Sequence, residues 1–164
     1  MRELLFLLLL TGLFACSHNT KDYNALKNKI DSLENKLAET YKPGFGELMS
    51  AVQVHHEKLW FAGINDNWKL ADFEIHEINE SLEDIKKFQS DRPESKDLDM
   101  INSGLDLIKT SIKEQNTLMF KNAYSILTNT CNECHKVTDF EFNIVKIPEA
   151  QSFSNQEFRI KPLN

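Results

Sequence analysis

The sequence predicts an all-α fold: an antiparallel four-helix bundle, preceded by an amphipathic helix and followed by an extended tail. Apolar residues recur at intervals of three and four in successive stretches, which is the period of a helix with one buried face. Short runs rich in Gly, Pro, Asn and Asp separate these stretches, so neighbouring helices are expected to run antiparallel. The chain has 164 residues, of which 41% are hydrophobic, which is enough for the core of one domain.

The first fifteen residues are predicted to be a signal peptide. Arg2 precedes an apolar run at residues 4–10, and the stretch 4–15 is too short to span a bilayer. Residues 13–16 (Leu-Phe-Ala-Cys) resemble the box at which bacterial lipoproteins are cleaved and lipidated, so Cys16 is the expected lipid attachment site. Simple secretion with a free thiol at Cys16 is the alternative. Ser17 favours the outer membrane, facing the periplasm, by resemblance to other lipoproteins.

Residues 16–42 are predicted to form a lipidated tether and a short coiled-coil helix. Five large residues repeat at intervals of three and four: Tyr23, Leu26, Ile30, Leu33 and Leu37. This pattern indicates either a stalk that makes a homo-oligomer through residues 23–41 or a helix packed on its own domain. Pro43-Gly44 is expected to end the helix.

The four helices of the bundle are expected within residues 43–139, at about 45–62, 68–89, 95–113 and 117–135. Their inward faces are predicted from helical spacing. The expected inward residues include Phe45, Leu48, Met49, Val52, Leu59 and Trp60 on the first helix, Ala71, Ile75, Ile78, Leu82 and Ile85 on the second, Leu98, Ile101, Leu105, Ile108 and Ile112 on the third, and Phe120, Ala123, Ile126 and Leu127 on the fourth. Residues 140–164 contain two prolines and are expected to lie over the bundle as an extended tail.

The run Cys131-Asn132-Glu133-Cys134-His135 carries the strongest chemical signal in the chain. Two cysteines separated by two residues and followed by histidine are the attachment signature for one covalent haem c. In that chemistry each thiol bonds one vinyl group of the haem, and the adjacent His135 serves as proximal ligand of the iron.

Two other chemistries use paired cysteines. A thioredoxin-like pair opens a helix, where the helix dipole lowers the thiol pKa, whereas this pair is expected near the end of a helix. A structural zinc site needs four ligands, and a chain with three cysteines would have to recruit distant histidines or carboxylates. Haem attachment is therefore preferred, with zinc and a redox disulfide as alternatives.

The late haem motif on a four-helix bundle resembles the cytochrome c-prime family over residues 45–140. The run from Pro43 to Met49 and the run from His55 to Gly63 also resemble those of uncharacterised exported mono-haem proteins of bacteria. The family pattern places an aromatic residue and an arginine three and four residues after the haem histidine, where this chain has Thr138 and Asp139. Because of this difference, the charges near the proximal histidine are expected to differ from those of the family.

The sixth ligand of the iron determines what the haem can do. In low-spin relatives a methionine early in the first helix fills this position, and Met49 is at the matching place. A thioether binds haem iron and raises its potential. His55 and His56 are alternative distal ligands. Met49 and His56 lie two helical turns apart, so they cannot bind the same iron together. His76, between Asp72 and Glu80, is expected at the surface.

The expected function is electron transfer by an exported, membrane-tethered c-type cytochrome whose redox partner is an unidentified protein. A five-coordinate haem that binds or senses a gas is the alternative. A helical lipoprotein with a non-haem metal site, built from histidines and carboxylates, is a weaker one. No catalytic set of nucleophile, base and oxyanion donors is visible, so an enzyme is not expected. The net charge of −6 argues against a nucleic-acid partner and suits a basic protein partner.

Overall fold

The computed structural model describes residues 19–40 and 42–160, except for the side chains of residues 19, 20 and 38. The predicted signal peptide (residues 1–15) and lipidation site (Cys16) lie outside this part of the chain. The chain divides into two compact units, with the boundary between Lys42 and Pro43. In the first unit, helix α2 runs over Asn19–Thr40.

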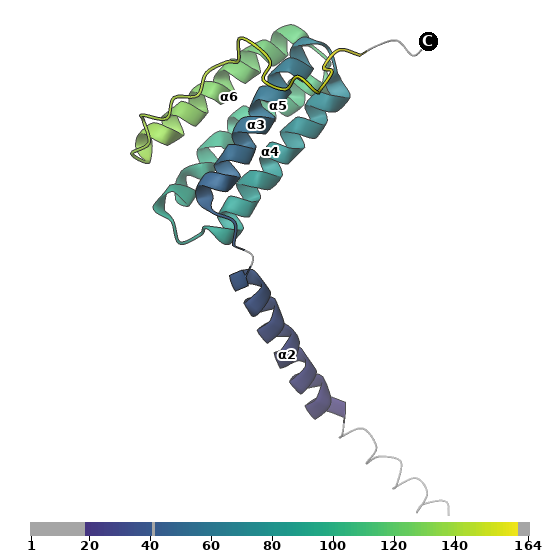
Figure 1. The fold of residues 1–164 in the computed structure, drawn as a ribbon, viewed down its shortest axis with the longest axis vertical. Helices are drawn as coiled ribbons and strands as arrows, with labels where there is room; N and C mark the ends of the chain where they lie inside the picture. The colour runs from purple at the N-terminus through teal and green to yellow at the C-terminus, as the bar shows by residue number, and fades with distance from the viewer. Residues whose placement is uncertain (1–18, 41, 161–164) are drawn as a thin grey trace, which may run out of the picture. The chain divides into compact units, whose positions relative to one another are not determined.

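The second unit is an all-α bundle, as the sequence predicts, and no strand occurs in the described residues. Figure 1 shows its helices side by side, with the tail lying along α6. Its elements are α3 (Phe45–Ile64), α4 (Trp68–Phe88), the 3-10 helix η2 (Pro93–Ile101), α5 (Asn102–Lys113) and α6 (Thr117–Val137). Loops of only a few residues join α3 to α4, α4 to η2, and α5 to α6, which requires these neighbours to reverse direction, whereas α5 continues directly from η2.

Asparagine side chains cap the N-termini of two of these helices. Asn67 accepts a hydrogen bond from the backbone N–H of Leu70 at the start of α4. Asn116 accepts from the N–H groups of Leu118 and Met119 at the start of α6. Each satisfies donors that a helix leaves without partners in its first turn. The turn residues therefore fix where α4 and α6 begin.

Most of the core of the bundle was predicted from apolar spacing, but Phe61, Ala62 and Phe158 are also buried and were not in the predicted set. One residue of α6 was placed on the wrong face. Ile126 was expected to face inward, but 45% of its surface is exposed, whereas Tyr124 is fully buried. The inward stripe of α6 runs through Phe120, Ala123, Tyr124, Leu127 and Thr128. A tyrosine and a threonine take inward positions there because their hydroxyl groups find hydrogen-bond partners inside the bundle.

The helix expected at residues 95–113 is two elements, because its first part winds as the nine-residue 3-10 helix η2. Three residues apart, Ser95, Leu98 and Ile101 are all buried. A 3-10 helix has three residues per turn, so this spacing places all three on one side. The Ser95 hydroxyl also donates to the carbonyl of Gln89 at 2.7 Å, which ties the start of η2 to the end of α4.

The tail follows an extended path over the bundle, as predicted. Phe158 is completely buried and packs against Phe61, and its carbonyl accepts a hydrogen bond from Asn67. Between α6 and this anchor, the N–H of Ser152 donates to the carboxylate of Glu57 at 2.6 Å. The tail is therefore fixed to α3 at two points. No described helix has the length and apolar character needed to cross a bilayer.

Candidate functional site

The predicted haem motif occupies the last two turns of α6. Cys131 is partly buried, Cys134 is 5% exposed, and both lie on the side of α6 that faces the bundle. The Cys134 sulfur lies 3.9 Å from the carbonyl oxygen of Asp97 in η2. A separation of three residues puts two side chains on the same face of a helix, so the motif presents both thiols to one region.

A cavity of about 560 Å³ opens in front of these thiols. It lies between α3, α6 and the tail, with two core residues at its floor. Its lining includes Met49, Val52, Gln53, His56 and Glu57 from α3, Cys131, Cys134 and His135 from α6, Leu82 and Ile101 from the core, and Asn143, Val145, Pro148 and Ser152 from the tail. Cofactor pockets in proteins usually measure about 300–1,000 Å³ and are mostly apolar with a few polar groups.

A second cavity of about 180 Å³ shares part of this lining. Met49, Gln53, Cys134, His135 and Asn143 line both cavities. The second one extends toward the start of α3 and the start of η2, where Phe45, Glu94 and Leu98 line it. The structure thus brings Met49 and His135, from opposite helices, to the same open space.

The His135 ring is held in one tautomer by the tail. Its Nδ1 lies 2.6 Å from the backbone carbonyl oxygen of Asn143. A carbonyl oxygen can only accept, so Nδ1 carries the proton and donates it. The other nitrogen, Nε2, is therefore the one that can bind a metal when the ring is neutral. Metal-binding histidines are commonly oriented in this way, by a hydrogen bond from the nitrogen that does not bind the metal.

Asn132, between the two cysteines, also holds the tail. Its side-chain N–H donates to the carbonyl of Val145 at 2.9 Å, and its oxygen accepts from the Val145 N–H at 2.8 Å. Both side-chain groups of Asn132 are therefore paired with one backbone residue. Together with the His135–Asn143 bond, they fasten residues 143–145 over the motif.

His56 lines the larger cavity but has both ring nitrogens in use. The Thr128 hydroxyl donates to the carbonyl of Tyr124, so it accepts from His56 Nε2–H at 3.1 Å. The Tyr124 hydroxyl lies 2.9 Å from His56 Nδ1 and 2.7 Å from the His56 carbonyl oxygen, and it donates its proton to these two acceptors. Burial lowers the pKa of His56 to about 4, so the ring is neutral near pH 7.

His55 is directed away from the motif, toward α4. Its Nδ1 lies 2.7 Å from a carboxylate oxygen of Glu74, and its Nε2 lies 3.9 Å from Glu77. It is absent from the lining of both cavities. The structure therefore does not bring His55 together with Cys131, Cys134 and His135. His76 is at the surface as expected, 3.3 Å from Glu80.

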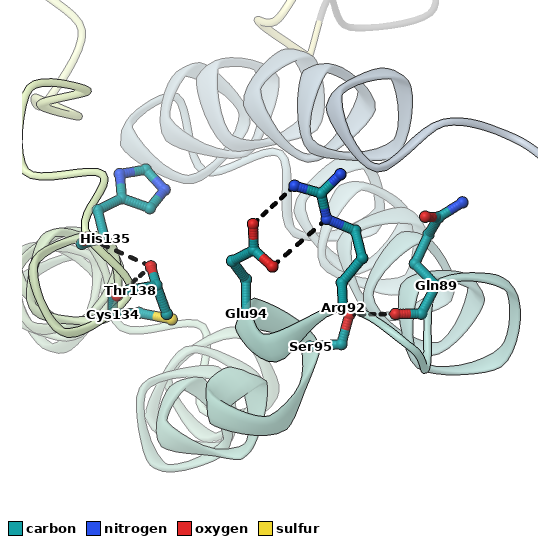
Figure 2. Close-up of polar contacts among 7 residues, drawn as sticks. All are labelled: Gln89, Arg92, Glu94, Ser95, Cys134, His135 and Thr138. Atoms are coloured by element: carbon teal, nitrogen blue, oxygen red, sulfur yellow. Dashed lines mark hydrogen bonds and ion pairs between the residues drawn. The ribbon is translucent and has the colours of Figure 1, made fainter.

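Glu94, which lines the smaller cavity, forms an ion pair with Arg92. Figure 2 shows Glu94 projecting from the start of η2 toward Arg92, with the His135 ring projecting from α6. Arg92 donates to both carboxylate oxygens of Glu94, at 2.7 and 3.4 Å. The hydrogen bond from Arg92 lowers the pKa of Glu94, so this carboxylate is ionised and its charge is balanced by the guanidinium.

The two thiols have the properties of buried cysteines. Burial raises the pKa of Cys131 to about 12, and it also raises the pKa of Cys134. Neither forms a disulfide. In the described part of the chain, no three His, Cys, Asp or Glu side chains converge closely enough to hold a metal ion.

Sequence reasoning missed several residues of this site. Gln53 and Glu94 line the cavities, Asn132 and Asn143 hold the tail and the His135 ring, and Tyr124 and Thr128 occupy the nitrogens of His56. Of these residues, only Asn132 could have been singled out from the sequence, because it lies between Cys131 and Cys134. Comparisons with protein-family models, with curated proteins and with solved structures give no match. The resemblance to the cytochrome c-prime family stays a prediction.

Proposed function

We propose that this chain binds one haem c, attached through Cys131 and Cys134 with His135 as proximal ligand, and that it transfers electrons without acting as an enzyme. The observation that carries the proposal is the state of His135. Its Nδ1–H is engaged by the Asn143 carbonyl, which leaves Nε2 as the nitrogen that a metal can bind, and His135 lines a cavity that both cysteines also line. A proximal histidine requires that arrangement.

The space and its lining suit a haem. The larger cavity, of about 560 Å³, has the size of a cofactor site, and Val52, Leu82 and Ile101 give it an apolar wall. A bound haem would supply a reversible change of iron oxidation state. The chain's own residues would hold the group covalently, orient the His135 ring and limit the access of water through the tail.

The competing chemistries find less support. A zinc site requires several ligands that point to one position, and the Cys131, Cys134 and His135 side chains do not form such a group. A redox disulfide requires an easily ionised thiol, whereas the pKa of Cys131 is raised to about 12. The same absence of a converging group among described residues weighs against the non-haem metal alternative.

Met49 is the best candidate for the sixth ligand. It lines both cavities together with His135, and no hydrogen-bonding role competes for its sulfur. His56 would have to give up its bonds to Thr128 and Tyr124 before binding iron. His55 would have to leave the carboxylate of Glu74 and turn to another face of α3. A His135–Met49 pair would keep the iron six-coordinate, which suits an electron carrier.

The optical spectrum of the oxidised and reduced protein, with and without carbon monoxide, tests this assignment. We expect a low-spin spectrum, little reaction with carbon monoxide, and a weak near-infrared band from the thioether that disappears in Met49→Ala. Met119→Ala is the matched control, because this α6 methionine is 42% exposed and lines neither cavity. A low-spin spectrum without that band would reassign the ligand to a histidine.

A gas-binding haem is the second candidate function. Gln53 lies one helical turn from Met49 and lines the same two cavities, so its amide can offer a hydrogen bond to a small ligand. A high-spin spectrum with ready binding of carbon monoxide, reduced in Gln53→Leu, would favour this function over electron transfer.

The proposed place of action is the cell envelope, with a lipid on Cys16 that tethers the protein to the outer membrane on its periplasmic side. The amino-terminal sequence supports this location, and haem attachment to such motifs in bacteria follows export. Cys16→Ser should release the protein from the membrane fraction, with Ser17→Ala as the control that stays bound. Unchanged fractionation of Cys16→Ser would contradict lipidation.

A further inference from the structure

Helix α2 presents a row of large apolar side chains to solvent. Tyr23, Leu26, Ile30, Leu33 and Leu37 are 46–69% exposed. They lie on one stripe, because they are separated by three and four residues along a single helix. Removing such side chains from water is favourable. Most of the stability of a helix in a protein comes from packing of its apolar face, so α2 gains most from a partner that covers the stripe.

The stripe has the pattern of a coiled-coil core. With Tyr23, Ile30 and Leu37 at the first position (a) of each heptad, Leu26 and Leu33 fall at the fourth (d). A β-branched residue at a, combined with leucine at d, favours two parallel strands. Ile30 between Leu26 and Leu33 supplies this combination at the centre of the helix.

The charges beside the stripe specify the partner and its register. In a parallel pair, the residue before each a position (g) faces the residue five places later (e) on the other helix. Asp22 then faces Lys27 of the second copy, and Lys29 faces Glu34 of the second copy. Both contacts pair opposite charges, and the two-fold symmetry of a homodimer repeats each of them.

A shift of one heptad weakens this complementarity. In a pair of identical helices the two directions of shift give the same arrangement, which places Asp22 opposite Glu34 and Lys29 opposite Lys27 as like charges and leaves Lys36 opposite Glu34 as the attractive contact. The charges therefore favour one register and disfavour its nearest alternatives, which is how charged flanking positions select partners in coiled coils. All four side chains are exposed and free to make these contacts.

We propose that α2 is the dimerisation element of this protein, and that it pairs with α2 of a second copy of the chain as a parallel, in-register two-stranded coiled coil. Each dimer then carries two copies of the unit formed by residues 43–164. The proposal uses only residues of α2, so it is independent of the haem.

Sedimentation equilibrium of the full chain carrying Cys16→Ser tests the dimer. The substitution excludes a dimer made by a lipid group or a disulfide at Cys16. We expect a monomer–dimer equilibrium, and a monomer for Leu33→Lys, which puts a charge at the centre of the core. Ser32→Lys, at an exposed position outside the stripe, is the control that should remain dimeric. A monomeric parent, or a dimer that survives Leu33→Lys, would overturn the proposal.

Charge reversal tests the register. Lys29→Glu should raise the dimer dissociation constant about tenfold, because two attractive contacts become repulsive. Adding Glu34→Lys should restore the parental value, since each reversed charge again meets its opposite. Lys29 has no charged neighbour three or four residues away in its own helix, whereas Glu34 lies three residues from Asp31, so Glu34→Lys alone is the control for the contact that it changes within α2. Failure of the second substitution to restore the dimer would exclude this register.

Disulfide trapping tests the direction of the helices. Leu26→Cys, in the Cys16→Ser background, places two copies of the new thiol in one core layer only if the helices are parallel and in register. We expect a covalent dimer under mild oxidation, and none from the background protein. A non-covalent dimer that fails to cross-link through Leu26→Cys would show a different pairing and contradict the proposal.

Discussion

Asn132 shows how a single side chain joins the predicted haem motif to the tail. Its amide makes two hydrogen bonds to the backbone of Val145, at 2.8 and 2.9 Å. The backbone of this extended segment makes few other bonds, so the amide replaces the partners that a strand or helix would supply. The residue between the cysteines therefore positions the tail over the cavity that Cys131, Cys134 and His135 line.

Asn132→Ala should loosen the tail. Loss of two hydrogen bonds is expected to lower the free energy of unfolding by about 1–2 kcal/mol and to speed proteolysis within residues 140–152 about tenfold. Limited proteolysis followed by mass spectrometry measures the cleavage rate. Glu133→Ala is the matched control, because this neighbouring side chain is exposed and its carboxylate lies 4.0 Å from the ammonium group of Lys136. Equal rates in the two variants would mean that Asn132 does not hold the tail.

His56 makes the stability of the bundle depend on pH. Its pKa is about 4 in the folded protein because burial disfavours the charged ring, whereas an unfolded histidine has a pKa of about 6.5. Protons therefore bind the unfolded chain first as the pH falls. The stabilising contribution of neutral His56 is complete above pH 6.5 and is lost between pH 6.5 and 4.

Between pH 7 and pH 4, the free energy of unfolding should fall by about 3 kcal/mol through His56 alone. Urea unfolding at several pH values measures this loss. His56→Gln should remove most of the dependence in this range, whereas His76→Gln should leave it intact because His76 is exposed at the surface. The same pH dependence in both variants would assign it to other groups.

At the scale of the elements, the contact between α3 and α6 depends on Gly63. A Cβ atom at this position would overlap the ring of Phe120. Phe120 is completely buried and stacks among Trp60, Trp68 and Tyr124, so its ring has no room to move away. The absent side chain of Gly63 thus sets how closely α3 and α6 approach.

Gly63→Ala should lower the free energy of unfolding by roughly 1–3 kcal/mol, which is the usual cost of overfilling a packed core. Gly46→Ala, in the first turn of the same helix, is the control, because a Cβ there meets nothing within 4 Å. It should be neutral or stabilising by up to about 1 kcal/mol. Chemical denaturation measures the free energy of unfolding of both variants. If Gly63→Ala leaves it unchanged, Phe120 can repack, which would contradict this prediction.

The helices could be predicted from the sequence because apolar spacing and turn residues are local signals. The expected stretch 117–135 and the observed α6, for example, differ by two residues at one end. The 3-10 helix η2 was not predicted, although its buried residues Ser95, Leu98 and Ile101 repeat every three residues, as the turns of a 3-10 helix do. The burial of Tyr124 was not predicted, because it depends on His56, which is 68 residues away in the sequence. No local sequence pattern indicates such a pair.

The site was predictable only in part. Cys131, Cys134 and His135 form a motif, and Met49, at a position chosen from helical spacing, lines the larger cavity with all three. The carbonyl of Asn143 and the backbone of Val145 carry no side-chain signal, since any residue can offer these groups. The path of the tail depends on such contacts and on the distant anchor at Phe158, so single-sequence reasoning could not give it.

At the scale of the whole molecule, two units are expected to perform separate tasks. Helix α2 carries the exposed stripe proposed to pair with a second copy, and residues 43–164 carry the proposed haem site. A variant made monomeric by Leu33→Lys should therefore keep its haem and its spectrum. The net charge of −6 favours a basic redox partner, whose binding should weaken as the salt concentration rises.

The covalent haem is tested most directly by the intact mass of the unfolded protein, produced in a host that attaches haem c. We predict that the chain is heavier by one haem than a Cys131→Ser, Cys134→Ser double variant from the same host, and that the haem absorbance stays with the polypeptide after denaturation. A chain with the mass of the unmodified polypeptide, and without haem absorbance, would contradict the assignment of this site.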